Sequence, residues 1–98
     1  MIRILWTQNQ DAGPGPRGYQ AMAYDSSRGR TVLFGGLGAS GVLADTWEWD
    51  GGNWTQMADS GPPARSSHAM AYDVQRNQTV LFGGRGSDAH DLKDDTWG

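Results

Sequence analysis

Cysteine is absent from this 98-residue chain, which excludes disulfides, thiolate catalysis and metal cages built on cysteine. No apolar run approaches the roughly 20 residues that cross a bilayer, so no membrane partner is expected. A basic excess is also missing, because eight lysines and arginines face eleven acidic residues and the net charge is −3. We therefore expect no nucleic-acid partner. Met1–Leu5 is too short for the apolar region of a signal peptide, so we expect a soluble, non-exported chain and leave its localisation open.

Glycine and tryptophan, by contrast, are plentiful, with fifteen and five copies. Glycine weakens regular elements, whereas tryptophan needs a large packing surface. Many tight turns that join short, well-packed strands would reconcile the two. No segment has helical periodicity, so the sequence predicts an all-β fold.

An internal repeat organises the chain. Residues 6–38 match residues 54–86 at an offset of 48, with 20 of 33 positions identical. Beyond Gly86 the second copy carries two extra residues, so Asp45-Thr46-Trp47 matches Asp95-Thr96-Trp97 at an offset of 50. We interpret this insertion as a loop.

Each repeat contains four short segments of β-type sequence, separated by stretches rich in glycine, proline, serine, asparagine or aspartate. In the first complete repeat they are residues 20–25, 31–36, 45–50 and 53–57. The third segment alternates and places Asp45, Trp47 and Trp49 on one side. Gly51-Gly52 before the fourth segment is a hairpin turn signal. Four strands at a period near 50 predict a propeller blade rather than a helical solenoid.

Several residue types recur at matching positions of the two repeats. They are an arginine before the first segment, a glycine doublet that ends the second, and tryptophans in the third and fourth: Arg17 and Arg65, Gly35-Gly36 and Gly83-Gly84, Trp47 and Trp97, Trp6 and Trp54. In this pattern nearly the whole chain resembles the kelch-repeat family. The resemblance implies two four-stranded antiparallel propeller blades. Gln20 stands where the second repeat has His68, which indicates that this position is structural.

The resemblance also implies how the strands are distributed. With strands labelled a to d from the inside of a blade outward, the chain order is d, a, b, c, d, a, b, c. Residues 1–98 then form a single two-blade unit, in which 1–8 are an exchanged outer d strand, 9–57 a first full blade, and 58–98 a second blade that awaits a d strand from another chain. The strands expected to meet between chains carry Ile2, Ile4 and Trp6 in one and Asp95 and Trp97 in the other.

Two blades cannot close a propeller, which has typically about four to eight. Left alone, the unit would expose an unpaired strand edge and two apolar faces. Head-to-tail association with copies of itself closes a ring when the rotation per subunit divides the circle. The kelch resemblance favours six blades and hence a homotrimer, while a dimer, a tetramer and a fragment of a longer array stay open.

The loops hold the candidate binding residues. In kelch relatives the b-to-c and d-to-a loops share one face, which here corresponds to residues 9–19, 37–44, 57–67 and 85–94. The residues singled out for binding are Tyr19, His68, Arg85, Asp88 and His90. A protein or a glycan is the ligand expected there.

Metal, cofactor and catalytic chemistry are weakly signalled. Asp88, Asp91 and Asp94 could offer oxygen ligands, but their spacing is not that of a calcium loop. We therefore predict no metal and no cofactor. The serines before His68 are not set in a nucleophile-turn motif, so no catalytic residue is predicted either.

The repeated arginines and tryptophans have a simpler interpretation. Arg17 and Arg65 could bind anions, but their recurrence at one repeat position favours a structural task such as bonding loop carbonyls. The tryptophans could stack on sugars, but four of the five recur at blade-packing positions. We therefore expect both sets to be structural.

These observations predict a non-enzymatic, self-assembling kelch propeller subunit, with any ligand at a loop face or in the axial channel. The alternative is a carbohydrate- or protein-binding kelch fragment of a larger secreted protein. The near-identity of the two repeats is typical of recent duplication or of deliberate construction, and the sequence does not decide between these origins.

Overall fold

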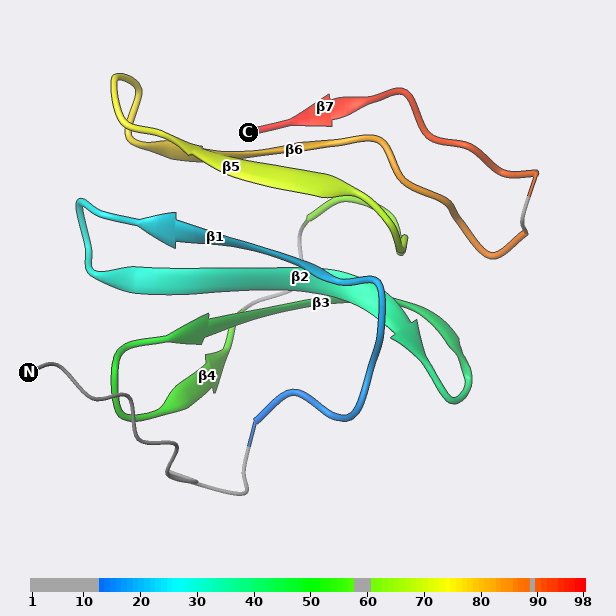
Figure 1. The fold of residues 1–98 in the computed structure, drawn as a ribbon, viewed down its shortest axis with the longest axis horizontal. Helices are drawn as coiled ribbons and strands as arrows, with labels where there is room; N and C mark the ends of the chain where they lie inside the picture. The colour runs from blue at the N-terminus through cyan, green and yellow to red at the C-terminus, as the bar shows by residue number, and fades with distance from the viewer. Residues whose placement is uncertain (1–12, 58–60, 89) are drawn as a thin grey trace, which may run out of the picture.

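The computed structural model describes residues 13–57, 61–88 and 90–98, and this part of the chain is all β, as predicted (Figure 1). Its strands form two antiparallel sheets with no helix among the described residues, and hence none there that could span a membrane. The first sheet contains β1 (Ala21–Asp25), β2 (Arg30–Gly38), β3 (Gly41–Trp49) and β4 (Trp54–Gln56). The second contains β5 (Ala69–Asp73), β6 (Gln78–Phe82) and β7 (Thr96–Trp97).

The first sheet is a meander of neighbouring strands in the order β1-β2-β3-β4. The four strands predicted for the first complete repeat are all present. The glycine pair predicted to turn between the third and fourth does so, with Gly51 at φ 102°. Asp50 stabilises this turn, because its Oδ1 accepts hydrogen bonds from the backbone amides of Gly52 and Asn53. Beyond it, Trp49 pairs with Trp54, and their ring centroids lie 5.4 Å apart.

A glycine doublet produces a bulge in the middle of β2. Gly35 and Gly36 take φ angles of 67° and 110°, and the pairing with β3 shifts register between Phe34 and Gly36. Residues with a side chain rarely adopt these φ angles, so the two glycines permit the bulge. Pairing then resumes and continues to a turn at residues 39 and 40. The prediction that residues 37–44 form a loop is therefore wrong, because most of this segment is strand.

The second sheet repeats the first with one strand fewer. β5 pairs with β6 so that Ala69 lies opposite Phe82, just as Ala21 lies opposite Phe34. β6 also pairs with β7, where Leu81 lies opposite Trp97. Within the described residues β7 has a neighbour on one edge only. The residues predicted to supply an exchanged strand, Ile2, Ile4 and Trp6, lie outside the described part of the chain.

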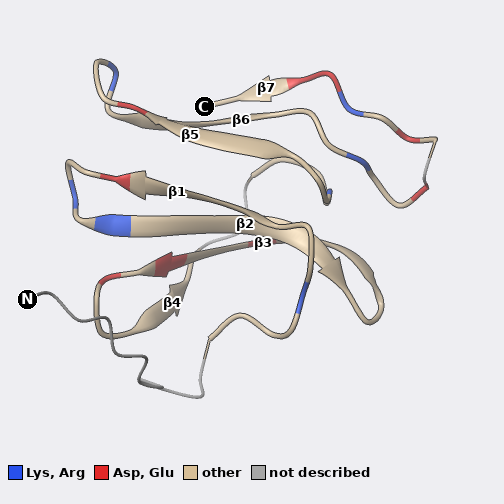
Figure 2. Cartoon of the chain, viewed as in Figure 1, with Lys and Arg blue, Asp and Glu red and all other residues tan. Residues whose placement is uncertain are grey.

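The two sheets pack against each other, with β1 beside β5 (Figure 1). Figure 2 shows charged residues at turns, at strand ends and along β3, whereas the middles of β1, β2, β5 and β6 carry none. The first sheet buries Ala23, Val32 and Phe34, and the second buries Leu81. A cleft of about 330 Å³ between the sheets is lined partly by Val32, Phe34, Met70 and Leu81. The junction between the sheets is therefore an apolar core of limited size.

Candidate functional site

A buried arginine joins the strands of the second sheet. Arg65 is 0% exposed, and its guanidinium donates to both carboxylate oxygens of Asp95 at 2.6 and 2.8 Å. It also donates to the carbonyls of Gly83 and Pro63 at 2.9 and 3.2 Å. The indole of Trp97 donates to Asp95 at 2.7 Å. Each guanidinium nitrogen thereby donates to at least one oxygen atom of the protein, which a buried group with several donors and no acceptor needs.

The first sheet contains the same arrangement at the equivalent positions. Arg17 donates to both carboxylate oxygens of Asp45 at 2.6 and 2.9 Å and to the Gly35 carbonyl at 3.1 Å. Trp47 donates to Asp45 at 2.8 Å. The prediction that the repeated arginines bond loop carbonyls is confirmed, because Arg17 also donates to the Gly15 carbonyl at 3.1 Å, as Arg65 does to that of Pro63. Their carboxylate partners were missed, although the recurrence of an aspartate two residues before each tryptophan was a signal for them.

These arginines also hold both carboxylates in their charged form. The hydrogen bonds from Arg17, followed by that from Trp47, lower the pKa of Asp45 below its ordinary 3.8, against an opposing effect of burial. Arg65 and then Trp97 lower the pKa of Asp95 well below the ordinary range. The stability that depends on the lowered values is complete above pH 3.8 and is lost as the pH falls below it.

His68 connects the two sheets. It lies just before β5, is buried, and its Nε2 lies 2.8 Å from the carbonyl oxygen of Phe34 in β2. A carbonyl can only accept, so Nε2 carries the proton and donates. The His68 ring also packs edge-on against the Phe34 ring, with centroids 5.6 Å apart. Burial lowers the pKa of His68, and the nearby charge of Arg65 lowers it further. The histidine is therefore a neutral part of the junction.

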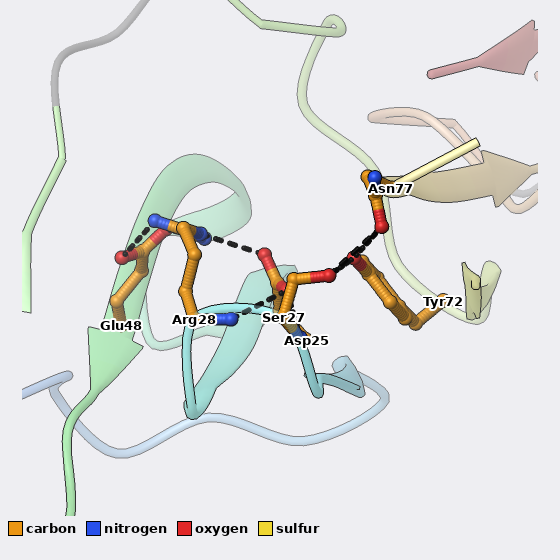
Figure 3. A network of polar contacts seen from close by, with 6 residues as sticks. All are labelled: Asp25, Ser27, Arg28, Glu48, Tyr72 and Asn77. Carbon is orange, nitrogen blue, oxygen red and sulfur yellow. Dashed lines mark hydrogen bonds and ion pairs between the residues drawn. The ribbon is translucent and has the colours of Figure 1, made fainter. Parts of the chain in front are cut away.

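A polar contact closes the junction at the turns that follow β1 and β5 (Figure 3). The hydroxyl of Ser27 donates to Asn77 Oδ1 at 2.8 Å and lies 2.6 Å from the hydroxyl of Tyr72. Beside it, Arg28 bridges Asp25 at 2.6 Å and Glu48 at 2.8 Å within the first sheet. The turn of one sheet is thereby tied to the turn of the other.

Within the part of the chain that the structure describes, the junction leaves one face of each sheet uncovered. Phe34 is 3% exposed because the second sheet covers it, whereas its counterpart Phe82 is 53% exposed on the outer face of the second sheet. Tyr72 is half-buried against the first sheet, whereas its counterpart Tyr24 is 58% exposed. We call these surfaces the Phe82 face and the Tyr24 face. The two faces carry the same residue types that pack together inside the chain.

A cleft of about 570 Å³ lies where the loops of the two sheets meet. It is lined by Tyr19, Leu37, Ser40, Gly41, Val42, Ser66, Ser67, Arg85, Gly86 and Ser87. Tyr19 is 68% exposed and accepts a backbone hydrogen bond from Ser67 at 2.8 Å. Of the predicted binding residues, the structure thus brings Tyr19 and Arg85 together. Asp88, His90 and the buried His68 do not line this cleft.

Two of the three aspartates weighed as metal ligands have other partners. Asp88 accepts a hydrogen bond from the backbone amide of His90 at 2.9 Å, and Asp91 forms an ion pair with Lys93 at 3.3 Å. Over residues 13–57, 61–88 and 90–98, no three histidine or acidic side chains gather as a metal would require. The geometry therefore gives no support to a metal centre at Asp88, Asp91 and Asp94.

The fold and its contacts define an all-β protein whose two packed antiparallel sheets come from one repeated sequence unit. The sequence matches no protein-family model, and a search of curated proteins likewise finds no match.

Proposed function

We propose that this chain is a non-enzymatic, two-blade subunit of a kelch-type β-propeller, and that it closes the propeller by associating with copies of itself. Each sheet is one blade, and the second lacks an outer strand among the described residues. The observation that carries the proposal is the exposure of Phe82, the counterpart of the buried Phe34. A Tyr24 face from another copy would cover Phe82 as the second sheet covers Phe34.

The gain from this contact is large for so small a chain. Burying one large apolar side chain contributes roughly 1.5–3 kcal/mol. Each contact between copies would bury Phe82 on one side and Met22 and Tyr24, at 47% and 58% exposure, on the other. Such an interface is heterologous, and it closes into a ring when its rotation fits the circle. Three two-blade chains would give six blades, so a homotrimer is the expected particle.

The open edge of β7 supports a second contact between copies. In the first sheet, β4 (Trp54-Thr55-Gln56) pairs with β3 in the register Trp47 to Gln56. The sequence Trp6-Thr7-Gln8 is identical to that of β4. Residues 2–8 of one copy are therefore proposed to pair with β7 of another, with Gln8 opposite Trp97. Removing residues 1–8 should then weaken assembly while both sheets still fold.

Replacing Phe82 tests the apolar contact. The variant Phe82→Asp places a charge where the partner face would exclude water, so association should weaken at least about tenfold. Val74→Asp is the matched control, because Val74 is 67% exposed and its counterpart Ser26 stays exposed at the junction inside the chain. Light scattering at several concentrations measures both. Equal association of the two variants would contradict the proposed interface.

The cleft that contains Tyr19 and Arg85 supports the second candidate, a carbohydrate- or protein-binding kelch unit of a larger secreted protein. Its lining offers a guanidinium, an exposed phenol and several serine hydroxyls, which are groups that orient polar ligands. Probing a glycan array with the chain and with its Arg85→Ala variant tests this candidate. Selective binding lost in the variant would favour it, and no binding would count against it.

A further inference from the structure

The junction inside the chain and the faces left open are not identical copies, and their differences fall at the contacting positions. This inference rests on the proposed function, in which the Phe82 face of one copy meets the Tyr24 face of the next. Equivalent positions in the two repeats are related by the offset of 48. Each contact seen inside the chain therefore specifies which residues would meet between chains.

The polar contact at the turns is the first difference. Inside the chain Ser27 reaches Tyr72 and Asn77, at 2.6 and 2.8 Å. Between chains the equivalent residues are Gln75 on the Phe82 face, with Tyr24 and Gly29 on the Tyr24 face. A short serine that meets asparagine is thus replaced by a long glutamine that meets glycine. The summed size of the pair is nearly conserved, which is the kind of exchange that packed contacts tolerate best.

The backbone has the same conformation at the two turns, so the exchange changes side chains only. Gly29 and Asn77 both take left-handed φ angles, 67° and 53°. A Cβ added at Gly29 would have one neighbour within 4 Å, the Tyr24 hydroxyl at 3.8 Å. Where the Asn77 side chain lies beside Tyr72, position 29 thus has no side chain beside Tyr24, and a Cβ there would meet no other described atom within 4 Å. The longer side chain of Gln75 has room there, and its amide can bond the Tyr24 hydroxyl as Ser27 bonds Tyr72.

The second difference is at the position of His68. Inside the chain, His68 Nε2 donates to the Phe34 carbonyl at 2.8 Å. Between chains the equivalent donor is Gln20, which is exposed, and the equivalent acceptor is the carbonyl of Phe82. A glutamine side-chain amide can also donate to a carbonyl. The change from histidine to glutamine thus preserves the hydrogen bond.

We propose that the occupant of both open faces is a second copy of this chain, and that Gln75 opposite Gly29 is a size-matched pair that specifies this intermolecular contact. A Tyr24 face with an asparagine at position 29, as the second repeat has at Asn77, would collide with Gln75 of the neighbouring copy. A face that carried a serine at position 75 would leave a gap beside Gly29. The pair therefore discriminates between correctly and incorrectly matched faces.

A double-mutant cycle tests the pairing. Gly29→Asn and Gln75→Ser are made singly and together, and the dissociation constant of the assembled particle is measured by analytical ultracentrifugation. Each single variant should dissociate about tenfold more readily, and the double variant should recover most of that loss because it recreates the Ser27–Asn77 arrangement. Tryptophan near-ultraviolet circular dichroism checks folding. Asparagine tolerates this backbone angle, as Asn77 does.

The outcomes separate this inference from the proposal beneath it. A wild-type chain that remains a folded monomer overturns both. An assembled wild type whose double variant dissociates as readily as the worse single variant overturns the Gln75–Gly29 pairing alone. The control Asn77→Gly alters the same contact inside the chain, so it should lower folding stability. If Gly29→Asn instead lowers folding stability and leaves association unchanged, the intermolecular assignment is wrong.

Discussion

At the scale of single residues, the repeated Arg–Asp–Trp clusters could be predicted only in part from the sequence. The structural role of the arginines was predicted, and their aspartate partners were not. Recurrence favours a structural role for Arg17 and Arg65, and their hydrogen bonds to backbone carbonyls agree with it. Their partners Asp45 and Asp95 lie 28 and 30 residues further along the chain. Such a distant pairing depends on the register between strands. In a single sequence, the only indication of this register is the pair of offsets at which the two repeats match.

Removing a buried arginine should be costly. Arg65→Ala removes the guanidinium that donates to the Gly83 and Pro63 carbonyls and to Asp95, so the free energy of unfolding should fall by about 3 kcal/mol. Arg76→Ala is the control, because the Arg76 side chain is 69% exposed and its ion pair with Asp73 is open to water. Urea titration at fixed chain concentration measures both. Equal losses in the two variants would contradict the structural role of Arg65.

His68 should make folding sensitive to mild acid. Its pKa is lowered by burial from the ordinary 6.5, so the unfolded chain takes up a proton more readily and stability falls as the pH drops below about 6.5. The positive charge of Arg65 also disfavours the protonated form of His68, and the His68 Nδ1 has no hydrogen-bond partner among the described residues. His68→Gln, which installs the residue of the first repeat, should flatten this dependence between pH 7 and 5. Parallel stability curves for the two proteins would refute it.

At the scale of elements, the strands of the first sheet were predictable and their lengths were not. Short segments of β-type sequence, separated by stretches rich in turn residues, located β1 and β2. The doublet at Gly35 and Gly36 was expected to end the second strand, whereas it forms a bulge after which pairing with β3 resumes. Composition cannot distinguish these outcomes, because glycine suits both a loop and a bulge. The extended β2–β3 hairpin follows from the contacts of Leu37 and Val42 across the two strands.

The bulge can be tested through Gly35. A Cβ there would lie 2.6 Å from the Arg65 carbonyl oxygen, at a φ of 67°, so Gly35→Ala should cost at least about 1–3 kcal/mol. Gly15→Ala is the control, because a Cβ at Gly15 would meet nothing within 4 Å. Thermal unfolding followed by circular dichroism compares them. A harmless Gly35→Ala would show that the close approach of β2 to the Arg65 segment does not matter for stability.

At the scale of the whole molecule, the repeated sequence predicts the all-β class and the exposure of one apolar face on each outer side of the two-sheet unit. The difference in exposure between equivalent residues, with Phe34 buried and Phe82 exposed, could not be predicted from the sequence of one repeat. It depends on which face of each sheet is covered, and this is a property of packing. The loop-end cleft was predicted only in part, since Tyr19 and Arg85 meet there while Asp88 and His90 do not.

The most direct test of the central claim is the mass of the intact chain in native buffer across a range of concentrations. Native mass spectrometry should find a folded particle of three 10.6 kDa chains, because a closed ring covers every Phe82 face and every Tyr24 face and the kelch resemblance favours six blades. A stable, folded species with the mass of one chain would contradict self-assembly through these faces.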